Sequence, residues 1–162
     1  MVSDSVLAIG GECEEPRSLS FADLARIPNE HQVNDVSRIV PARNGDAVTL
    51  AGVLELVRPK STAKYLGLHS STDNFHASIP LDAVKDRALV IYRLDGQPLP
   101  AKAGGPVRFF IPDFAACHTD EIDECANVKF VDSVELTATK GFDNRPHDGA
   151  SHEELHRKQA SG

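Results

Sequence analysis

Two short apolar runs flank a turn that is rich in glycine and proline. The runs are LVIY at residues 89–92 and VRFFI at residues 107–111, and both are rich in β-branched and aromatic residues. This composition predicts strands that are buried or half-buried. The segment DGQPLP at 95–100 lies between them, where Asp-Gly favours a turn and the prolines remove backbone donors. A basic residue, Arg108, lies inside the second run, and Lys129 lies inside a third apolar segment, so each cation needs a partner.

The length, charge and cysteine content of the chain exclude several classes of protein. The chain has 162 residues, which predicts one domain that can bury a sizeable core. A net charge of −7 argues against a nucleic-acid partner, and no apolar run is long enough to cross a membrane. The N-terminus lacks a basic segment typical of a signal peptide, and three scattered cysteines do not indicate a disulfide framework. We therefore expect a cytoplasmic protein.

The remaining pattern predicts short helices among more numerous strands. Ser20 with Asp23 three residues later resembles a capping box, and Thr49 precedes apolar residues at helical spacing. Further expected elements are strands at 6–9, 64–68 and 75–79, a helical turn at 81–85, and one long strand at 128–139 with a bend near 131–132. We predict an α+β domain at 1–140, mixed and mostly β, followed by a polar, mobile tail at 141–162.

Six segments occur in an order that resembles a known family. They lie at 18–24, 48–54, 63–66, 95–100, 105–112 and 127–131, and the most specific are the turn DGQPLP, the strand GPVRFFIP and the strand NVKFV. Together they resemble the molybdopterin-binding domain of the sulfite oxidase family of oxidoreductases. The resemblance implies a mixed α+β fold with a mostly β core.

The resemblance also implies a role for the two cations. In the family, the matching arginine and lysine help to bind the phosphate of the pterin cofactor, and they correspond to Arg108 and Lys129. A guanidinium and an ammonium in a partly desolvated pocket suit a phosphate dianion, which makes an anionic small molecule the expected partner. From the residues alone, both side chains could instead extend to solvent from edge strands or pair with acidic residues.

The sequence departs from the family pattern at two places. Ala103 stands where the family usually has a histidine that contacts the cofactor. The segment 33–41, where the family has the cysteine that binds molybdenum, contains no cysteine. Neither Asp35 nor Ser37 replaces a soft thiolate donor. These departures predict a degenerate or absent molybdenum centre.

A separate cluster, Cys117, His118 and Cys125, surrounds a predicted short helix. Its residue types are compatible with zinc or another soft metal, although the spacing is not a standard one. The two cysteines could equally form a redox-sensitive pair or be buried thiols that flank the helix.

Three functions thus stay open from the sequence. The first is a molybdopterin-dependent oxidoreductase domain with a degenerate or absent molybdenum centre. The second is a non-catalytic binding or scaffold domain that retains the fold. The third is a small metalloprotein that uses Cys117, His118 and Cys125.

Overall fold

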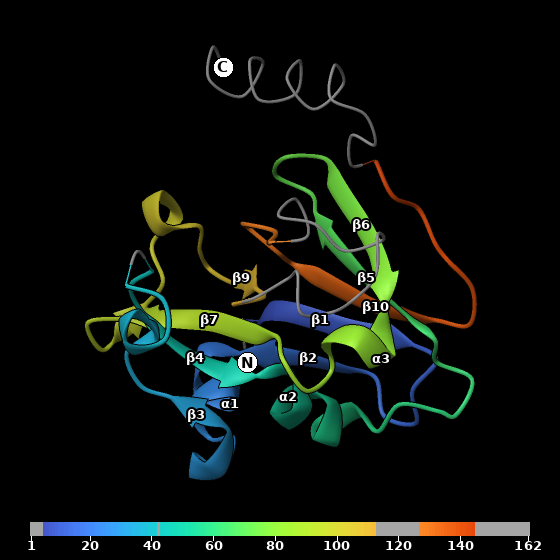
Figure 1. The fold of residues 1–162 in the computed structure, drawn as a ribbon, viewed down its shortest axis with the longest axis horizontal. Helices are drawn as coiled ribbons and strands as arrows, with labels where there is room; N and C mark the ends of the chain where they lie inside the picture. The colour runs from blue at the N-terminus through green and yellow to red at the C-terminus, as the bar shows by residue number, and fades with distance from the viewer. Residues whose placement is uncertain (1–4, 42, 113–126, 145–162) are drawn as a thin grey trace.

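The computed structural model describes residues 5–41, 43–112 and 127–144 and contains two five-stranded sheets (Figure 1). The first sheet has the order β2-β1-β10-β5-β6, and all its neighbours are antiparallel except the parallel pair β1 and β10. Its strands are β1 (Ser5–Gly11), β2 (Arg17–Ser20), β5 (Tyr65–Ser70), β6 (Phe75–Pro80) and β10 (Ser133–Thr137).

The second sheet has the order β3-β4-β7-β8, and β9 also pairs with β7. Its strands are β3 (Gln32–Val33), β4 (Asp46–Thr49), β7 (Leu89–Leu94), β8 (Gln97–Pro98) and β9 (Arg108–Phe110). Asp95 and Gly96 both have positive φ between β7 and β8, which confirms the predicted Asp-Gly turn.

The described residues form three short α-helices beside the strands, and two of them begin at the predicted caps. Helix α1 (Phe21–Ala25) has a complete capping box between Ser20 and Asp23. Helix α2 (Leu50–Val57) begins at Thr49, whose side chain accepts a hydrogen bond from the Gly52 N–H. Helix α3 (Leu81–Val84) is a single turn. Figure 1 shows α1 and α2 on the lower side of the strands.

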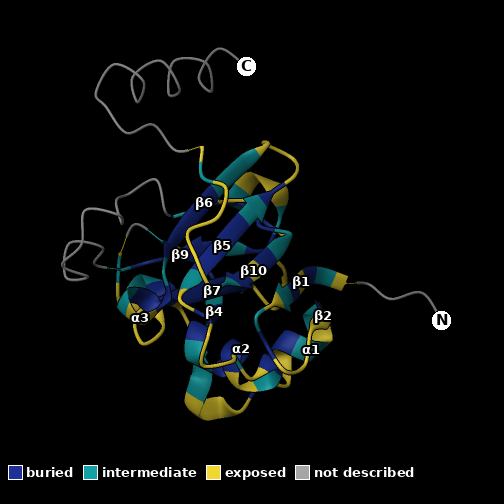
Figure 2. Ribbon diagram, turned by 90° about the vertical axis from the view of Figure 1, so that its right-hand side faces the viewer, coloured by how far each residue is buried: buried dark blue, intermediate teal, exposed yellow. Residues whose placement is uncertain are grey.

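The first four residues of β7, LVIY, are buried on both faces of the strand, which explains this uninterrupted apolar run (Figure 2). Val90 and Tyr92 belong to the main hydrophobic core, which joins the two sheets and the helices. Leu89 and Ile91 point to the opposite face and form a second, smaller cluster. The buried members of this second cluster are Val36, Ala47, Leu89, Ile91, Leu99 and Phe110.

The prediction of one strand over residues 128–139 is wrong, because β10 begins only at Ser133. Phe130 has a φ of 55°, and this left-handed conformation interrupts an extended strand. The preceding residues turn toward β9 instead: the Phe109 N–H donates to the Val128 carbonyl, and the Val131 N–H donates to the Val107 carbonyl. The change of face near residues 131–132 therefore lies where the chain leaves β9 and begins to pair with β1 and β5.

Residues 141–144 lie along β6. The Asn144 N–H donates to the His76 carbonyl, and the His76 N–H donates to Oδ1 of Asn144. The rest of the predicted tail lies outside the described residues, and the domain boundary at residue 140 stays a prediction. Among the described residues, no helix is both long and apolar enough to cross a membrane.

Candidate anion site

Strand β9 and the loop at 127–131 bring the two predicted site residues together. Val128 hydrogen-bonds to Phe109 and Val131 to Val107, so Lys129 and Phe130 lie alongside Arg108. Arg108 is half-buried and Lys129 is exposed. The break in the predicted long strand is therefore the feature that places these two cations side by side.

Gly104 lies between the two cationic side chains. A Cβ atom added there would be 3.1 Å from Cδ of Arg108 and 3.4 Å from Cγ of Lys129. Gly104 has a φ of 99°, and its carbonyl accepts a hydrogen bond from the Phe130 N–H at 2.8 Å. The Arg108 guanidinium donates from Nη1 to the Ala103 carbonyl at 3.4 Å. The short 3₁₀ helix Ala101–Ala103 thus ends in a glycine against which both stems pack.

Arg43 is a third cation at this site, and the sequence reading did not single it out. Its guanidinium carbon lies 5.3 Å from the centroid of the Phe110 ring, a cation–π distance. Phe110 is on β9, two residues beyond Arg108. No sequence signal links residue 43 to residue 108, because only the sheet places them near each other.

Arg43, Arg108 and Lys129 form a cationic cluster whose positive charge no carboxylate of the described residues balances. Burial, and in second place the positive charge of Arg43, lower the pKa of the Arg108 guanidinium. Nε of Arg108 is buried and has no hydrogen-bond partner among the described residues. No carboxylate of the described chain forms an ion pair with Arg43, Arg108 or Lys129, whereas Arg93 pairs with Asp46 at 2.8 Å. Within this part of the chain, the alternative of pairing with acidic residues finds no support.

Both places where the sequence departs from the family pattern lie beside this cluster. Ala103, Val36 and Val40 all pack in the second hydrophobic cluster, together with Phe110. The segment that would carry the metal-binding cysteine therefore reaches the cationic site, but it contributes apolar side chains there.

The structure describes one cysteine, Cys13, and it lies elsewhere. Cys13 is buried in the main core, and burial raises the pKa of its thiol. Cys117, His118 and Cys125 lie outside the described residues, so their predicted zinc site is not tested. The described residues contain no group of three or more histidine, cysteine, aspartate or glutamate side chains arranged to hold a metal ion.

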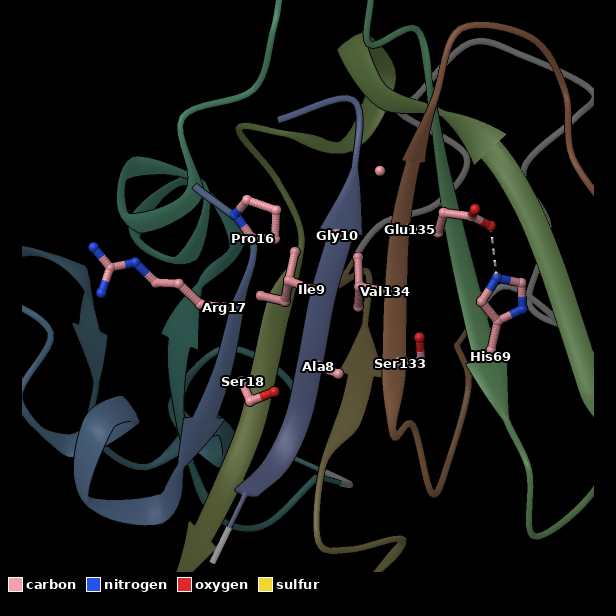
Figure 3. Close-up of a pocket in the computed structure, with 11 residues that line it drawn as sticks. Ala8, Ile9, Gly10, Pro16, Arg17, Ser18, His69, Ser133, Val134 and Glu135 are labelled. Atoms are coloured by element: carbon pink, nitrogen blue, oxygen red, sulfur yellow. Dashed lines mark ion pairs between the residues drawn. The ribbon is translucent and has the colours of Figure 1, made fainter. Parts of the chain in front are cut away.

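A separate open cleft of about 540 Å³ lies on the first sheet (Figure 3). Residues of β1, β2 and β10 line it, together with His69 of β5, and none of the three cations takes part. The cationic cluster and this cleft are therefore different features of the surface.

Comparisons with known proteins agree with the order of segments in the sequence. Residues 46–143 match the family described as the oxidoreductase molybdopterin-binding domain. This chain belongs to that family, the sulfite oxidase family. The match covers β4 to residue 143 and includes Arg108 and Lys129. The expected family and the mostly β fold are thereby confirmed.

Two known proteins are similar to this chain, one in sequence and one in fold. The chain is 26% identical over 159 residues to the catalytic subunit MsrP, a protein-methionine-sulfoxide reductase of Xanthomonas axonopodis pv. citri. The match covers 85% of this chain and 48% of the relative. The sulfane dehydrogenase SoxCD of Paracoccus pantotrophus has a similar fold, with a TM-score of 0.62, 18% identity, and coverage of 86% of this chain and 40% of that one. The chain thus spans about half the length of these proteins or less.

Proposed function

We propose that this domain binds the phosphorylated pterin of a molybdopterin cofactor, with Arg43, Arg108 and Lys129 around the phosphate. The observation that carries the proposal is the buried Nε of Arg108, which has no acceptor among the described residues and lies beside two more cations. A phosphate oxygen would accept from Nε, and the phosphate charge would offset the repulsion between the two arginines. A bound molybdopterin that carried molybdenum would supply the redox chemistry of that metal.

The geometry of Gly104 also supports this proposal. The absence of a side chain leaves room between the stems of Arg108 and Lys129, so that both charged groups can approach one anion. The exposed position of Lys129 leaves the site open to solvent on one side. The proposed binding of phosphate thus depends on the charge of Arg108 and Lys129, on the burial of Arg108 and on the space that Gly104 leaves.

The segment 33–41, where the family has its metal-binding cysteine, differs in character from the cationic cluster. The segment 33–41 contributes Val36 and Val40 to the second hydrophobic cluster and contains no cysteine, and Cys13 is buried in the main core. We therefore include in the proposal that the segment 33–41 provides no thiolate ligand and that the molybdenum centre is degenerate. A non-catalytic binding domain is the second candidate, and the same packing favours it.

The test is the pterin and molybdenum content of protein made in a host with an intact cofactor pathway. We expect the wild-type chain to release a fluorescent oxidised pterin with little molybdenum. Arg108→Gln and Lys129→Gln should each lower the retained pterin by about 10-fold or more, since a hydrogen bond to a charged group contributes roughly 1.5–3 kcal/mol. Lys85→Gln is the matched control, because Lys85 pairs with Asp82 on the surface of α3.

Each outcome decides a part of the proposal. Absence of pterin from the wild-type chain, or equal pterin in all variants, would overturn the phosphate assignment. One molybdenum per pterin would leave the phosphate site in place and contradict the degenerate metal centre.

A further inference from the structure

Two histidines face each other across the hairpin formed by β5 and β6. His69 and His76 are directly paired in the strand register. Their rings are 5.0 Å apart between centroids, and the two Nδ1 atoms are only 2.8 Å apart. This is a hydrogen-bond distance, so one Nδ1 carries a hydrogen and donates it to the lone pair of the other.

The outer nitrogen of each ring lies near an oxygen atom of a neighbouring side chain. Nε2 of His69 lies 3.5 Å from a carboxylate oxygen of Glu135, and Nε2 of His76 lies 3.2 Å from Oδ1 of Asn74. An N–H at Nε2 of either ring would have an oxygen acceptor nearby, so both rings can adopt the tautomer with the hydrogen on Nε2. A neutral imidazole has only one N–H, so in that tautomer the Nδ1 lone pair of each ring can bind a cation. A cation bound by both Nδ1 atoms would take the place of the hydrogen that they share.

Neighbouring residues hold both rings in place. A Cβ atom at Gly67 would be 3.1 Å from Nε2 of His69, so glycine leaves room for the contact with Glu135. The Phe142 ring packs on His76 with centroids 4.8 Å apart, and Asn144 binds both backbone groups of His76. The pair is therefore ordered before any ligand arrives.

The pair is also within reach of solvent. Figure 3 shows His69 and Glu135 on adjacent strands at the edge of the open cleft. The His69 side chain is 21% exposed, which leaves an approach for a small hydrated ion.

We propose that His69 and His76 bind a divalent transition-metal ion through their Nδ1 atoms, with water in the remaining positions. Two metal–nitrogen bonds of about 2.0 Å across a 2.8 Å gap enclose an angle of about 90°. A right angle suits the tetragonal geometry of Ni²⁺ or Cu²⁺ better than the tetrahedral geometry of zinc. Glu135 and Asn74 would accept hydrogen bonds from the outer N–H groups, an arrangement common around metal-bound histidines.

The test is calorimetric titration of the full chain with Ni²⁺ alone. The chain has seven histidines, so the decisive quantity is the change in stoichiometry between variants. We expect His69→Gln and His76→Gln each to bind one Ni²⁺ fewer than the wild-type chain. His31→Gln is the matched control, because the polar contacts of His31 within the described part of the chain are with Thr49 and Glu55 and include no histidine. Equal stoichiometry in all four proteins would overturn the proposal.

A second variant tests the site even if the histidine variants fail to fold. Glu135 is exposed, and Glu135→Gln should leave the fold intact while it weakens this Ni²⁺ site by about 10-fold. An unchanged affinity in Glu135→Gln would contradict the assigned role of the outer nitrogens. A Ni²⁺ ion bound to His69 and His76 in a crystal of the complex would support the proposal directly.

Discussion

Gly104 is the residue at which the backbone makes room for the cationic cluster. Its φ of 99° is a conformation that residues with a Cβ atom rarely adopt, and its neighbours on two sides are Arg108 and Lys129. Backbone strain and side-chain crowding would therefore act together at this position. Gly96 provides a comparison, since its φ is 79° but nothing lies within 4 Å of an added Cβ atom.

We expect Gly104→Ala to lower the free energy of unfolding by about 1–3 kcal/mol and to reduce bound pterin, because the new methyl group pushes the cationic stems apart. Gly96→Ala should show a similar backbone cost and retain the pterin. Denaturant unfolding and pterin fluorescence measure the two effects. Equal pterin in both variants would show that Gly104 serves the turn alone.

Tyr92 connects the strand β7 to the region that follows α1. Its hydroxyl donates to Oε1 of Gln32 at 2.8 Å, and Nε2 of Gln32 donates to the carbonyls of Leu24 and Ile27. Tyr92→Phe keeps the ring but leaves Oε1 of Gln32 without this donor. We expect a loss of about 1–3 kcal/mol in the free energy of unfolding, measured in urea. An unchanged midpoint would mean that water replaces the hydroxyl without cost.

At the scale of elements, the caps of α1 and α2 were predictable because each depends on neighbouring residues in the sequence. Ser20 and Asp23 form both hydrogen bonds of the capping box, and Thr49 caps α2 as expected. The true start of the strand predicted over 128–139 was not predictable, because the alternation of apolar residues continues through the backbone turn at Phe130. A tertiary partner decides that turn: the Gly104 carbonyl accepts the Phe130 N–H.

The capping box gives α1 a dependence on pH. The hydrogen bonds from the Ser20 backbone and side chain hold the pKa of Asp23 below its ordinary value. A lowered pKa means that this stabilisation is present above the ordinary carboxyl pKa and is lost as the pH falls through the lower value of the folded state. Asp23→Asn should therefore cost about 0.5–1 kcal/mol at neutral pH, and the difference from the wild type should close in acid.

Unfolding curves between neutral and strongly acidic pH check this dependence. Asp82→Asn is the control, because Asp82 is in the first turn of α3 and makes only an exposed ion pair with Lys85. A constant difference between Asp23→Asn and wild type at every pH would exclude the capping carboxylate as its source.

At the scale of the whole molecule, the two sheets produce two hydrophobic clusters, and the candidate anion site lies beside the smaller one. Arg108 and Lys129 could be proposed from the sequence because they lie in segments typical of the family. Arg43 could not, because it is 65 residues from Arg108 and meets Phe110 only after β4 and β7 have paired. The same holds for Ala103 and Val36, whose shared cluster exists only in the folded chain.

The most direct measurement is a crystal structure of the chain purified with its pterin. The account predicts phosphate density within hydrogen-bond distance of Nε of Arg108 and Nζ of Lys129, with the Arg43 guanidinium on the same anion. A phosphate bound elsewhere, with these three cations facing solvent or each other, would contradict it.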